Sequence, residues 1–229
     1  MSIMKFFGDP ISPVCRSVML FLAANDIQHE FVLIDLKNRD TVNNEAFAAI
    51  NPNQRIPVID DNGFILTESS AILRYLAVKH KVADHWYPTA LQDRARVDEA
   101  LSFFPQNIRN GCFFHTCILP LRTGKPRDEV RCAELRASLK LALDFTENSL
   151  LKGKKFIGGD NISIADLQYL GEITQYLISH NEIYKGRPNM EQWMQDCEST
   201  LAPHFDKVFF KLRNVQASGH LKAEIDVSP

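Results

Sequence analysis

The local pattern of the chain changes near residue 90, and this change constrains the fold more than any other feature. Before it, short β-rich runs alternate with apolar helical runs in the order βαβ and then αββα, which indicates a small mixed sheet with helices packed on it. After it, strand signals give way to long amphipathic segments. We therefore expect an α/β domain over residues 1–81, a linker over 82–89 and an all-helical domain over 90–229.

Local signals predict several element ends and one buried face. Asp61-Asn62-Gly63, between two β-rich runs, predicts a hairpin turn. Ser163 and Asp166 have the spacing of a capping box and predict a helix start. The run HEFVLIDL alternates in a way that places three apolar side chains near a core, namely Phe31, Leu33 and Ile34.

The composition argues against several classes of function. The 229 residues carry 26 Lys and Arg against 28 Asp and Glu without a basic stripe, so nucleic acid is not expected as the main partner. We expect no membrane span, because no window of about 18 apolar residues exists, and MSIMKFFGDP reads as a strand rather than a signal peptide. The five cysteines fit no zinc or haem spacing. Reduced thiols, a cytoplasmic location and no bound metal are therefore expected.

The stretch ISPVCRSVMLFLAAND has a serine where thiol redox proteins carry the first of two cysteines. Ser12 precedes Pro13 and an apolar helical run, and serine at N-cap with proline at N1 is a strong helix start. Two interpretations stay open: Ser12 only caps the helix, or its hydroxyl and the helix N-terminus together stabilise a thiolate supplied from outside the chain. Cys15, one turn later, is expected to be a buried small apolar residue.

Three other places in the sequence allow both a structural and a functional interpretation. Pro57 is either an edge-strand proline or a cis proline that turns the backbone of Ile56 outward, toward an extended ligand. Glu68 and Ser69 precede a helix, so they either cap it or hold the ammonium and carboxylate of an α-amino acid. Arg109 is isolated among apolar neighbours; a salt bridge is the default, and an anionic ligand is the alternative.

Taken together, these stretches resemble the cytosolic glutathione transferases over almost the whole chain. NPNQRIPVIDDNGFILTESSAILRYL is similar to the glutathione-binding core of that family. DHWYPTALQDRARVDEAL and the serine of SPVCR are similar to the theta class in particular. The resemblance implies a thioredoxin-like N-terminal domain, an all-helical C-terminal domain, a homodimer, and glutathione as a co-substrate without a tightly bound cofactor.

The resemblance also implies roles for individual residues. Ser12 would be the catalytic serine, with its hydroxyl hydrogen-bonded to the glutathione sulfur. Glutathione itself would be bound by Arg55, Ile56, Pro57, Glu68, Ser69 and Arg109. The loop before the second helix lacks the histidine usual in the class, and the candidates to replace it are Arg39, Val42 and Asn43. The pocket for the second substrate would be lined by Ile11, Phe103, Cys112 and Phe113.

The implied reaction is attack of the glutathione thiolate on small hydrophobic electrophiles such as alkyl halides and epoxides, with hydroperoxide reduction as a further activity. The polar stretch that ends at Pro229 looks weakly structured, so we expect a more open electrophile site than in relatives with a longer helical tail. Two other functions remain: a non-catalytic protein of the same fold that binds glutathione or hydrophobic ligands, and a thiol oxidoreductase. The latter would need an accessible Cys15 of low pKa.

Overall fold

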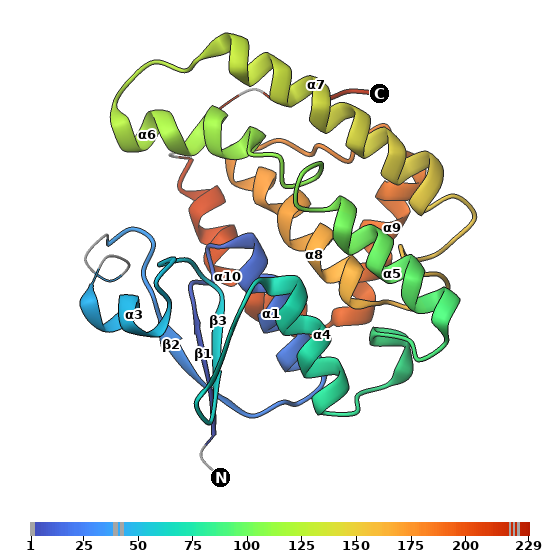
Figure 1. Ribbon diagram of the computed structural model, residues 1–229. Coiled ribbons are helices and arrows are strands. Elements are labelled where there is room, and N and C mark those ends of the chain that lie inside the picture. The colour runs from blue at the N-terminus through green and yellow to red at the C-terminus, as the bar shows by residue number, and fades with distance from the viewer. Residues whose placement is uncertain (1–2, 39–40, 42–43, 220, 222, 224) are drawn as a thin grey trace.

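The structure, a computed structural model, describes residues 3–38, 41, 44–219, 221, 223 and 225–229. The first part of the chain follows the predicted order βαβ and then αββα (Figure 1). Its elements are β1 (Met4–Gly8), α1 (Pro13–Ala24), β2 (His29–Leu33), α3 (Glu45–Ile50), β3 (Val58–Asp61), β4 (Phe64–Thr67) and α4 (Ser69–Lys79). The described strands form one sheet in the order β2-β1-β3-β4, in which β1 and β2 are parallel and the other pairs are antiparallel. This mixed sheet confirms the predicted α/β class.

Helices cover both faces of the sheet, because the apolar side chains of its central strands point alternately to either side. Phe6 and Ile59 belong to the main core, together with the buried faces of α1 and α4. Phe7 and Val58 point the other way and pack with Phe47 of α3 in a smaller cluster. Figure 1 shows α3 on one side of the sheet and α1 and α4 on the other.

The predicted hairpin is confirmed, whereas the prediction for β2 is partly wrong. Asn62 and Gly63 join β3 to β4, and both have positive φ, as a tight hairpin turn requires. Ile34 is buried as expected, but Phe31 and Leu33 are 40% and 50% exposed. The reason is that β2 is an edge strand, so its side chains have a neighbouring strand on one side only.

The rest of the chain is mainly helical, as predicted. Its elements are η1 (Asp84–Trp86), α5 (Leu91–Phe103), η2 (Phe114–Ile118), α6 (Leu119–Thr123), α7 (Glu129–Phe145), η3 (Thr146–Leu150), α8 (Ile164–Ile173), η4 (Thr174–Ser179), α9 (Pro188–Leu201) and α10 (His204–Ala217). α5 ends two residues before Pro105, which cannot continue a helix. Among the described residues, no helix is both long and apolar enough to cross a membrane.

α8 is completely buried and lies at the centre of the helical part, against α1 (Figure 1). The predicted capping box at its start is confirmed: the Ser163 hydroxyl accepts from the amide of Ala165, and the Asp166 carboxylate accepts from the amide of Ser163. Near its end, Gly171 allows α1 to approach closely, since a Cβ at this position would lie 2.5 Å from the carbonyl oxygen of Pro13. The Ser17 hydroxyl of α1 donates to the carbonyl of Leu167 at 2.7 Å. These contacts fix the start of α1, and therefore the place of Ser12.

Candidate functional site

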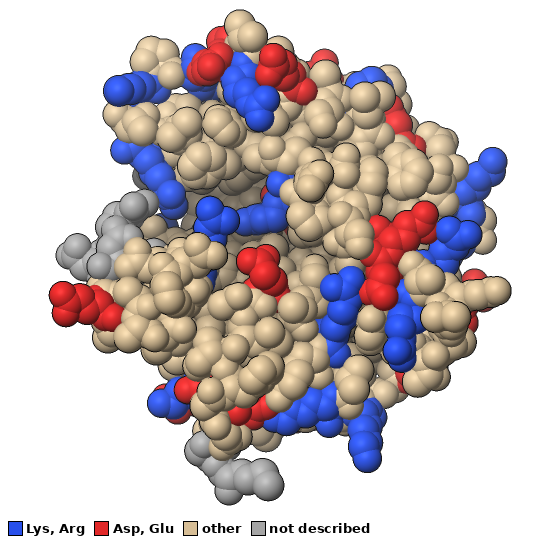
Figure 2. All heavy atoms as spheres, in the orientation of Figure 1, with Lys and Arg blue, Asp and Glu red and all other residues tan. Residues whose placement is uncertain are grey.

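A cavity of about 760 Å³ lies beside the start of α1. It is lined by residues from both parts of the chain: Ile11, Ser12, Pro13, Leu36, Lys37, Arg109, Gly111, Phe113, Phe114, Ile118, Leu121, Arg122, Glu172, Gln175, Ile178, Val215 and Leu221. Most of these side chains are apolar, and three are cations. Figure 2 shows a hollow on this side of the molecule with Lys and Arg side chains around it. The cavity is therefore suited to a small, largely apolar molecule.

Ser12 occupies the N-cap position of α1 but does not use its side chain as a cap. Its backbone is extended, with φ −77° and ψ 126°, and Pro13 follows at the first helical position. Among the described residues, the Ser12 hydroxyl accepts no capping hydrogen bond from its own helix. The side chain lines the cavity although the residue is only 5% exposed. The hydroxyl therefore does not bind the free N–H groups of its helix, and it lies at a helix N-terminus, where such groups favour an anion.

Cys15 lies one turn beyond Ser12 and is completely buried, as expected. Burial raises the pKa of its thiol to about 11, although a hydrogen bond with Ser12 acts in the opposite direction. A redox-active cysteine needs an accessible thiolate. This environment therefore argues against the thiol oxidoreductase hypothesis.

Arg109 forms an ion pair with Glu172 of α8, which confirms the default interpretation of this residue. Both side chains line the cavity, and the Glu172 carboxylate is almost completely buried. The charge of Glu172 raises the pKa of Arg109, against the effect of burial. The guanidinium thus faces the cavity with its charge largely balanced.

Two segments that contain residues expected to bind glutathione, 55–57 and 68–69, lie at the same end of the sheet as the segment that leads to Ser12. β1 ends at Gly8, four residues before Ser12, and its neighbour Phe7 is paired with Val58, which directly follows Pro57. Val58 is also paired with Thr67, the residue before Glu68. The strand register therefore brings three chain segments to the end of the sheet at which β1 leads to Ser12.

The peptide bond between Ile56 and Pro57 is cis, as the second interpretation of Pro57 expected. The carbonyl of Arg55 accepts a hydrogen bond from the Asn51 side chain at 2.7 Å. Ile56 precedes β3 and is not part of its ladder. Arg55, Ile56 and Pro57 do not belong to the lining of the described cavity.

Glu68 and Ser69 begin α4 with an unusual backbone. Glu68 is exposed and has φ 65°, which few residues other than glycine adopt without cost. Ser69 is buried at the first helical position. Strain of this kind is often kept at ligand sites. The loop candidates Arg39, Val42 and Asn43 lie outside the described residues.

Two of the four residues expected in the second-substrate pocket line the cavity, and two do not. Ile11 and Phe113 are part of its wall. Cys112 is completely buried and contacts the Thr116 hydroxyl, which is one helical turn away. Phe103 points elsewhere, and its ring packs on that of Phe145 at 4.8 Å between centroids.

Sequence reasoning did not identify most of the cavity wall. Phe114, Ile118 and Leu121 follow the i, i+4, i+7 spacing of one helical face, and that signal could have been used. Lys37 and Gln175 carry no such signal, because only the folding of distant segments brings them to Ser12.

The described residues beyond Gly219 form no helix or strand, but the last of them are not loosely attached. Leu221 forms part of the cavity wall. Beyond it, the Asn181 side chain donates to the carbonyl of Ala223 at 2.6 Å and accepts from the amide of Ile225 at 3.0 Å. Ile225 and Val227 are buried. The expectation of a weakly structured end is therefore wrong for residues 225–229.

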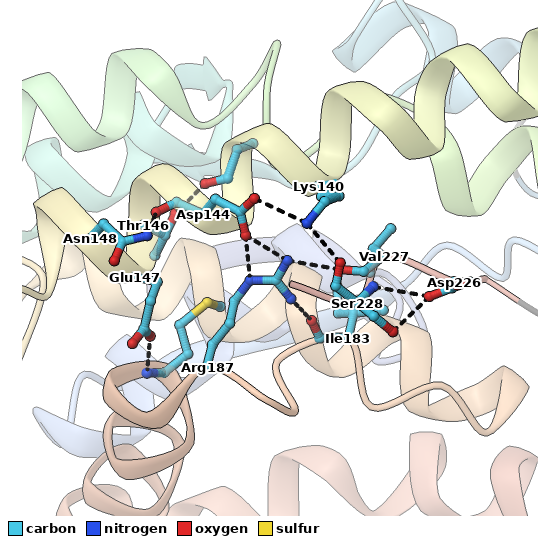
Figure 3. Close-up of polar contacts among 12 residues, drawn as sticks. Lys140, Asp144, Thr146, Glu147, Asn148, Ile183, Arg187, Asp226, Val227 and Ser228 are labelled. Atoms are coloured by element: carbon cyan, nitrogen blue, oxygen red, sulfur yellow. Dashed lines mark hydrogen bonds and ion pairs between the residues drawn. The ribbon is translucent and has the colours of Figure 1, made fainter.

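Arg187 anchors the last residues of the tail (Figure 3). Its guanidinium is buried and donates to the Asp144 carboxylate at 2.8 Å and to the carbonyl of Val227 at 2.7 Å. Lys140 binds the same carboxylate and also donates to the carbonyl of Ser228 at 2.7 Å. The tail therefore ends against α7, and Figure 1 shows the C-terminus beside that helix.

Known proteins similar to this chain share both its parts. The family descriptions "Glutathione S-transferase, N-terminal domain" and "Glutathione S-transferase, C-terminal domain" match residues 6–83 and 110–200. Glutathione S-transferase theta-1 of Bos taurus is 38% identical over 201 residues, which are 86% of this chain and 83% of the relative. The apo form of human glutathione-S-transferase T1-1 superimposes with a TM-score of 0.87 at 32% identity, covering 96% of this chain and 92% of the other. Human glutathione transferase theta-2, in complex with glutathione and an unknown ligand, superimposes with a TM-score of 0.87 at 31% identity, covering 96% of this chain and 93% of the other.

Proposed function

The chain belongs to the glutathione S-transferase family, with theta-class enzymes among its relatives, and we propose that it joins glutathione to small hydrophobic electrophiles. Glutathione is the co-substrate in this proposal, and no tightly bound cofactor takes part. The electrophile occupies the cavity beside Ser12, and the expected classes are alkyl halides and epoxides, with hydroperoxides as a further class.

One observation supports this proposal above the others, namely the environment of the Ser12 hydroxyl. It lies at a helix N-terminus, lines the cavity and is not used as a helix cap. A hydroxyl that only stabilised α1 would bind the free N–H groups of the first turn. The Ser12 hydroxyl can instead donate a hydrogen bond to a sulfur anion that enters from the cavity.

The energy needed to form the thiolate is within reach of these groups. A free thiol ionises near pH ~8.5, and lowering its pKa by about two units takes roughly 2.7 kcal/mol. A hydrogen bond to a charged group contributes about 1.5–3 kcal/mol, and a helix N-terminus adds up to about 1 kcal/mol. Ser12 and the start of α1 together therefore suffice to ionise bound glutathione near neutral pH.

The reaction then needs no further acid or base for an alkyl halide. The thiol proton leaves to water, and the sulfur lone pair forms a bond to the electrophilic carbon. The carbon–halogen bond breaks, and halide leaves with the bonding electrons. With an epoxide, the carbon–oxygen bond breaks instead and the ring oxygen takes a proton from water.

Glutathione is held at the end of the sheet where the three segments meet. In this proposal the backbone of Ile56 pairs with the cysteinyl part of the tripeptide, and the neighbouring Arg55 and Pro57 shape that contact. Glu68 and Ser69 at the start of α4 hold the γ-glutamyl end, which carries one ammonium and one carboxylate. Glu68 is exposed, so its carboxylate is accessible to this ligand.

We also propose that the protein is a cytoplasmic homodimer. Large apolar side chains are exposed at the end of α4 and the start of α5, where Val78 and Leu91 are 63% and 81% accessible. Light scattering that gives the mass of a monomer at micromolar concentration would contradict the dimer. Recovery in the membrane fraction after cell lysis would contradict the location.

The competing function is a binding protein without catalysis, and one titration separates the two. Thiolate absorbance in the ultraviolet is followed against pH for protein mixed with glutathione, after subtraction of protein alone. We expect wild type to hold a thiolate at pH 7, and Ser12→Ala to bind glutathione nearly as well but to lose the thiolate and about 100-fold in kcat. The control is Ser102→Ala at an exposed position, with no change expected.

Saturable binding by wild type without a thiolate would instead favour a carrier. Full turnover by Ser12→Ala with an alkyl halide would show that Ser12 only starts a helix. Turnover of alkyl halides, epoxides and hydroperoxides by wild type, measured side by side, tests the proposed substrate classes.

A further inference from the structure

Asp9 is completely buried in the turn that precedes Ser12, and its carboxylate binds three segments of the chain. One oxygen accepts from the amide of Ile11 at 3.0 Å and from the ammonium of Lys211 at 2.6 Å. The other oxygen accepts from the amide of Leu36 at 3.0 Å. The main-chain carbonyl of Asp9 accepts from the amide of Ser12 at 2.9 Å. One residue thus links Ser12 to the segment after β2 and to α10.

These three segments all line the cavity. Ile11 and Ser12 belong to the first and Leu36 to the second. The third, α10, contributes Val215, which lies one helical turn after Lys211. The contacts of the Asp9 carboxylate therefore hold together the part of the wall that surrounds the Ser12 hydroxyl.

Arg16 holds the same turn by donating hydrogen bonds to the carbonyl groups of the turn. Its buried guanidinium donates to the carbonyls of Ile11 at 2.9 Å and Pro10 at 3.2 Å. It also donates to the carbonyl of Gly171 at 2.8 Å and to the Gln175 side chain at 2.7 Å. The amides of the turn are hydrogen-bonded to Asp9, and its carbonyls are hydrogen-bonded to Arg16. A change at Asp9 is therefore expected to move the whole turn together with the segments that these two residues contact.

The charge of Asp9 acts against a thiolate at Ser12, because two negative groups close together repel each other. Cys15 shows this effect on a thiol of the same turn: burial raises its pKa to about 11 and the charge of Asp9 adds to the rise, while hydrogen bonds with Ser12 and with the Asp9 backbone, and the charge of Arg16, act in the opposite direction. Among the described residues, Lys211 forms an ion pair with this carboxylate from outside the turn, and the buried guanidinium of Arg16 also acts on it through its charge.

We propose that Lys211 is a positioning residue for Ser12: its ion pair with Asp9 balances the buried negative charge next to the sulfur site and holds the Ser12 turn against α10, which favours the thiolate form of bound glutathione. The inference rests on the proposed function, since it requires a thiolate at Ser12. Lys211 does not touch the substrate in this proposal and acts only through Asp9.

The test is the pH titration of bound glutathione in Lys211→Met, which keeps the apolar stem and removes the charge. We expect the pKa of the bound thiol to rise by about one unit, which is about tenfold less thiolate at a fixed pH below both values. The pH profile of kcat/KM is expected to shift by the same amount. Lys211→Arg is expected to restore the wild-type value. The matched control is Lys207→Met, one turn earlier on the exposed side of α10, which is expected to leave the pKa unchanged.

A second variant separates the charge effect from a loss of structure. In the double variant Lys211→Met with Asp9→Asn, both charges are absent, so we expect the thiol pKa to fall back toward the wild-type value. A purely structural role predicts the opposite, because Asp9→Asn removes one more hydrogen bond from the turn. A higher pKa in the double variant than in Lys211→Met would therefore overturn the proposal.

The outcomes also separate this proposal from the proposed function. A thiolate in wild type with the same pKa in Lys211→Met would overturn the role of Lys211 and leave the transferase intact. No thiolate in wild type would overturn the proposed function, and the role of Lys211 with it.

Discussion

At the scale of single residues, Ser12 and Cys15 are neighbours in one helical turn with opposite environments. Ser12 lines the cavity, whereas Cys15 is completely enclosed by the core. The buried thiol stays protonated at neutral pH, because its pKa is about 11 as a result of burial. Chemistry at this turn therefore belongs to the hydroxyl and to a sulfur that arrives with the substrate.

This division predicts the behaviour of Cys15→Ala. Loss of a buried sulfur leaves a small cavity, and we expect a decrease of about 1–2 kcal/mol in the free energy of unfolding. Turnover with glutathione is expected to stay within about twofold of wild type at 25 °C, where the variant remains folded. Chemical denaturation and steady-state kinetics measure the two quantities. A loss of turnover as large as that of Ser12→Ala would show that Cys15 takes part in the reaction.

At the scale of elements, the start of α1 is placed by its contact with α8. Gly171 leaves room for the carbonyl of Pro13, and a Cβ there would also lie 2.6 Å from the Ser17 hydroxyl. Both neighbours are held in place, because Ser17 is hydrogen-bonded to Leu167 and Pro13 begins a helix. The contact has no spare volume, so extra atoms at residue 171 have to displace α1 or α8.

We therefore expect Gly171→Ala to lower the free energy of unfolding by about 1–3 kcal/mol, as overpacked core positions do. It should also lower kcat, since α1 carries Ser12. Gly171→Val should have a larger effect on both quantities, which would link the loss to volume. Thermal unfolding and kinetics of the two variants provide the check. An unchanged free energy of unfolding in Gly171→Val would mean that α1 and α8 can move apart without loss of stability.

At the scale of the whole molecule, the C-terminal tail is tied to the helical part by charged side chains. Burial alone would raise the pKa of the Asp144 carboxyl, but the hydrogen bond and charge of Arg187, together with Lys140, hold it below the usual 3.8. The folded state therefore binds this proton less readily than the unfolded chain. The resulting stability is complete above about pH 4 and is lost as the pH falls through the lower pKa of the folded state.

Asp144→Asn is expected to remove this dependence. The variant should be less stable than wild type at pH 7, and the two should converge as the pH falls from about 4 toward 2. Urea unfolding at a series of pH values measures the difference. Asp206→Asn is the matched control, because its ion pair with Arg213 is exposed and contributes little. If the free energies of unfolding of Asp144→Asn and wild type changed in parallel with pH below pH 4, the lowered pKa of Asp144 would not be the cause of this pH dependence.

The sequence predicts those parts of this molecule that depend on neighbouring residues. The start of α1 at Pro13, the turn at Asn62 and the capping box of Ser163 each follow from a few consecutive side chains. Contacts between distant segments could not be predicted in this way. Asp9 meets Lys211 across 202 positions, and only the packing of α10 against the Ser12 turn brings them together.

Exposure at an edge strand is a second property that local pattern does not determine. Alternation in β2 predicted that Phe31 and Leu33 lie near a core, yet both are substantially exposed. The pattern is correct for a strand with neighbours on both sides, and the sequence of β2 does not say where the strand stands in the sheet. The same limit applies to the cavity wall, to which Lys37 and Gln175 come from separate parts of the chain.

The contact between α1 and α8 also has a consequence for how this protein tolerates evolutionary change. Its hydrogen bonds end on main-chain oxygens: Ser17 donates to the carbonyl of Leu167, and Arg16 to that of Gly171. Carbonyl oxygens stay in place when the side chains around them mutate. The sequences of the two parts of the chain can therefore change at different rates while α1 and α8 still pack together. This requires that residue 171 remains small and that the hydrogen-bond donors at positions 16 and 17 are kept.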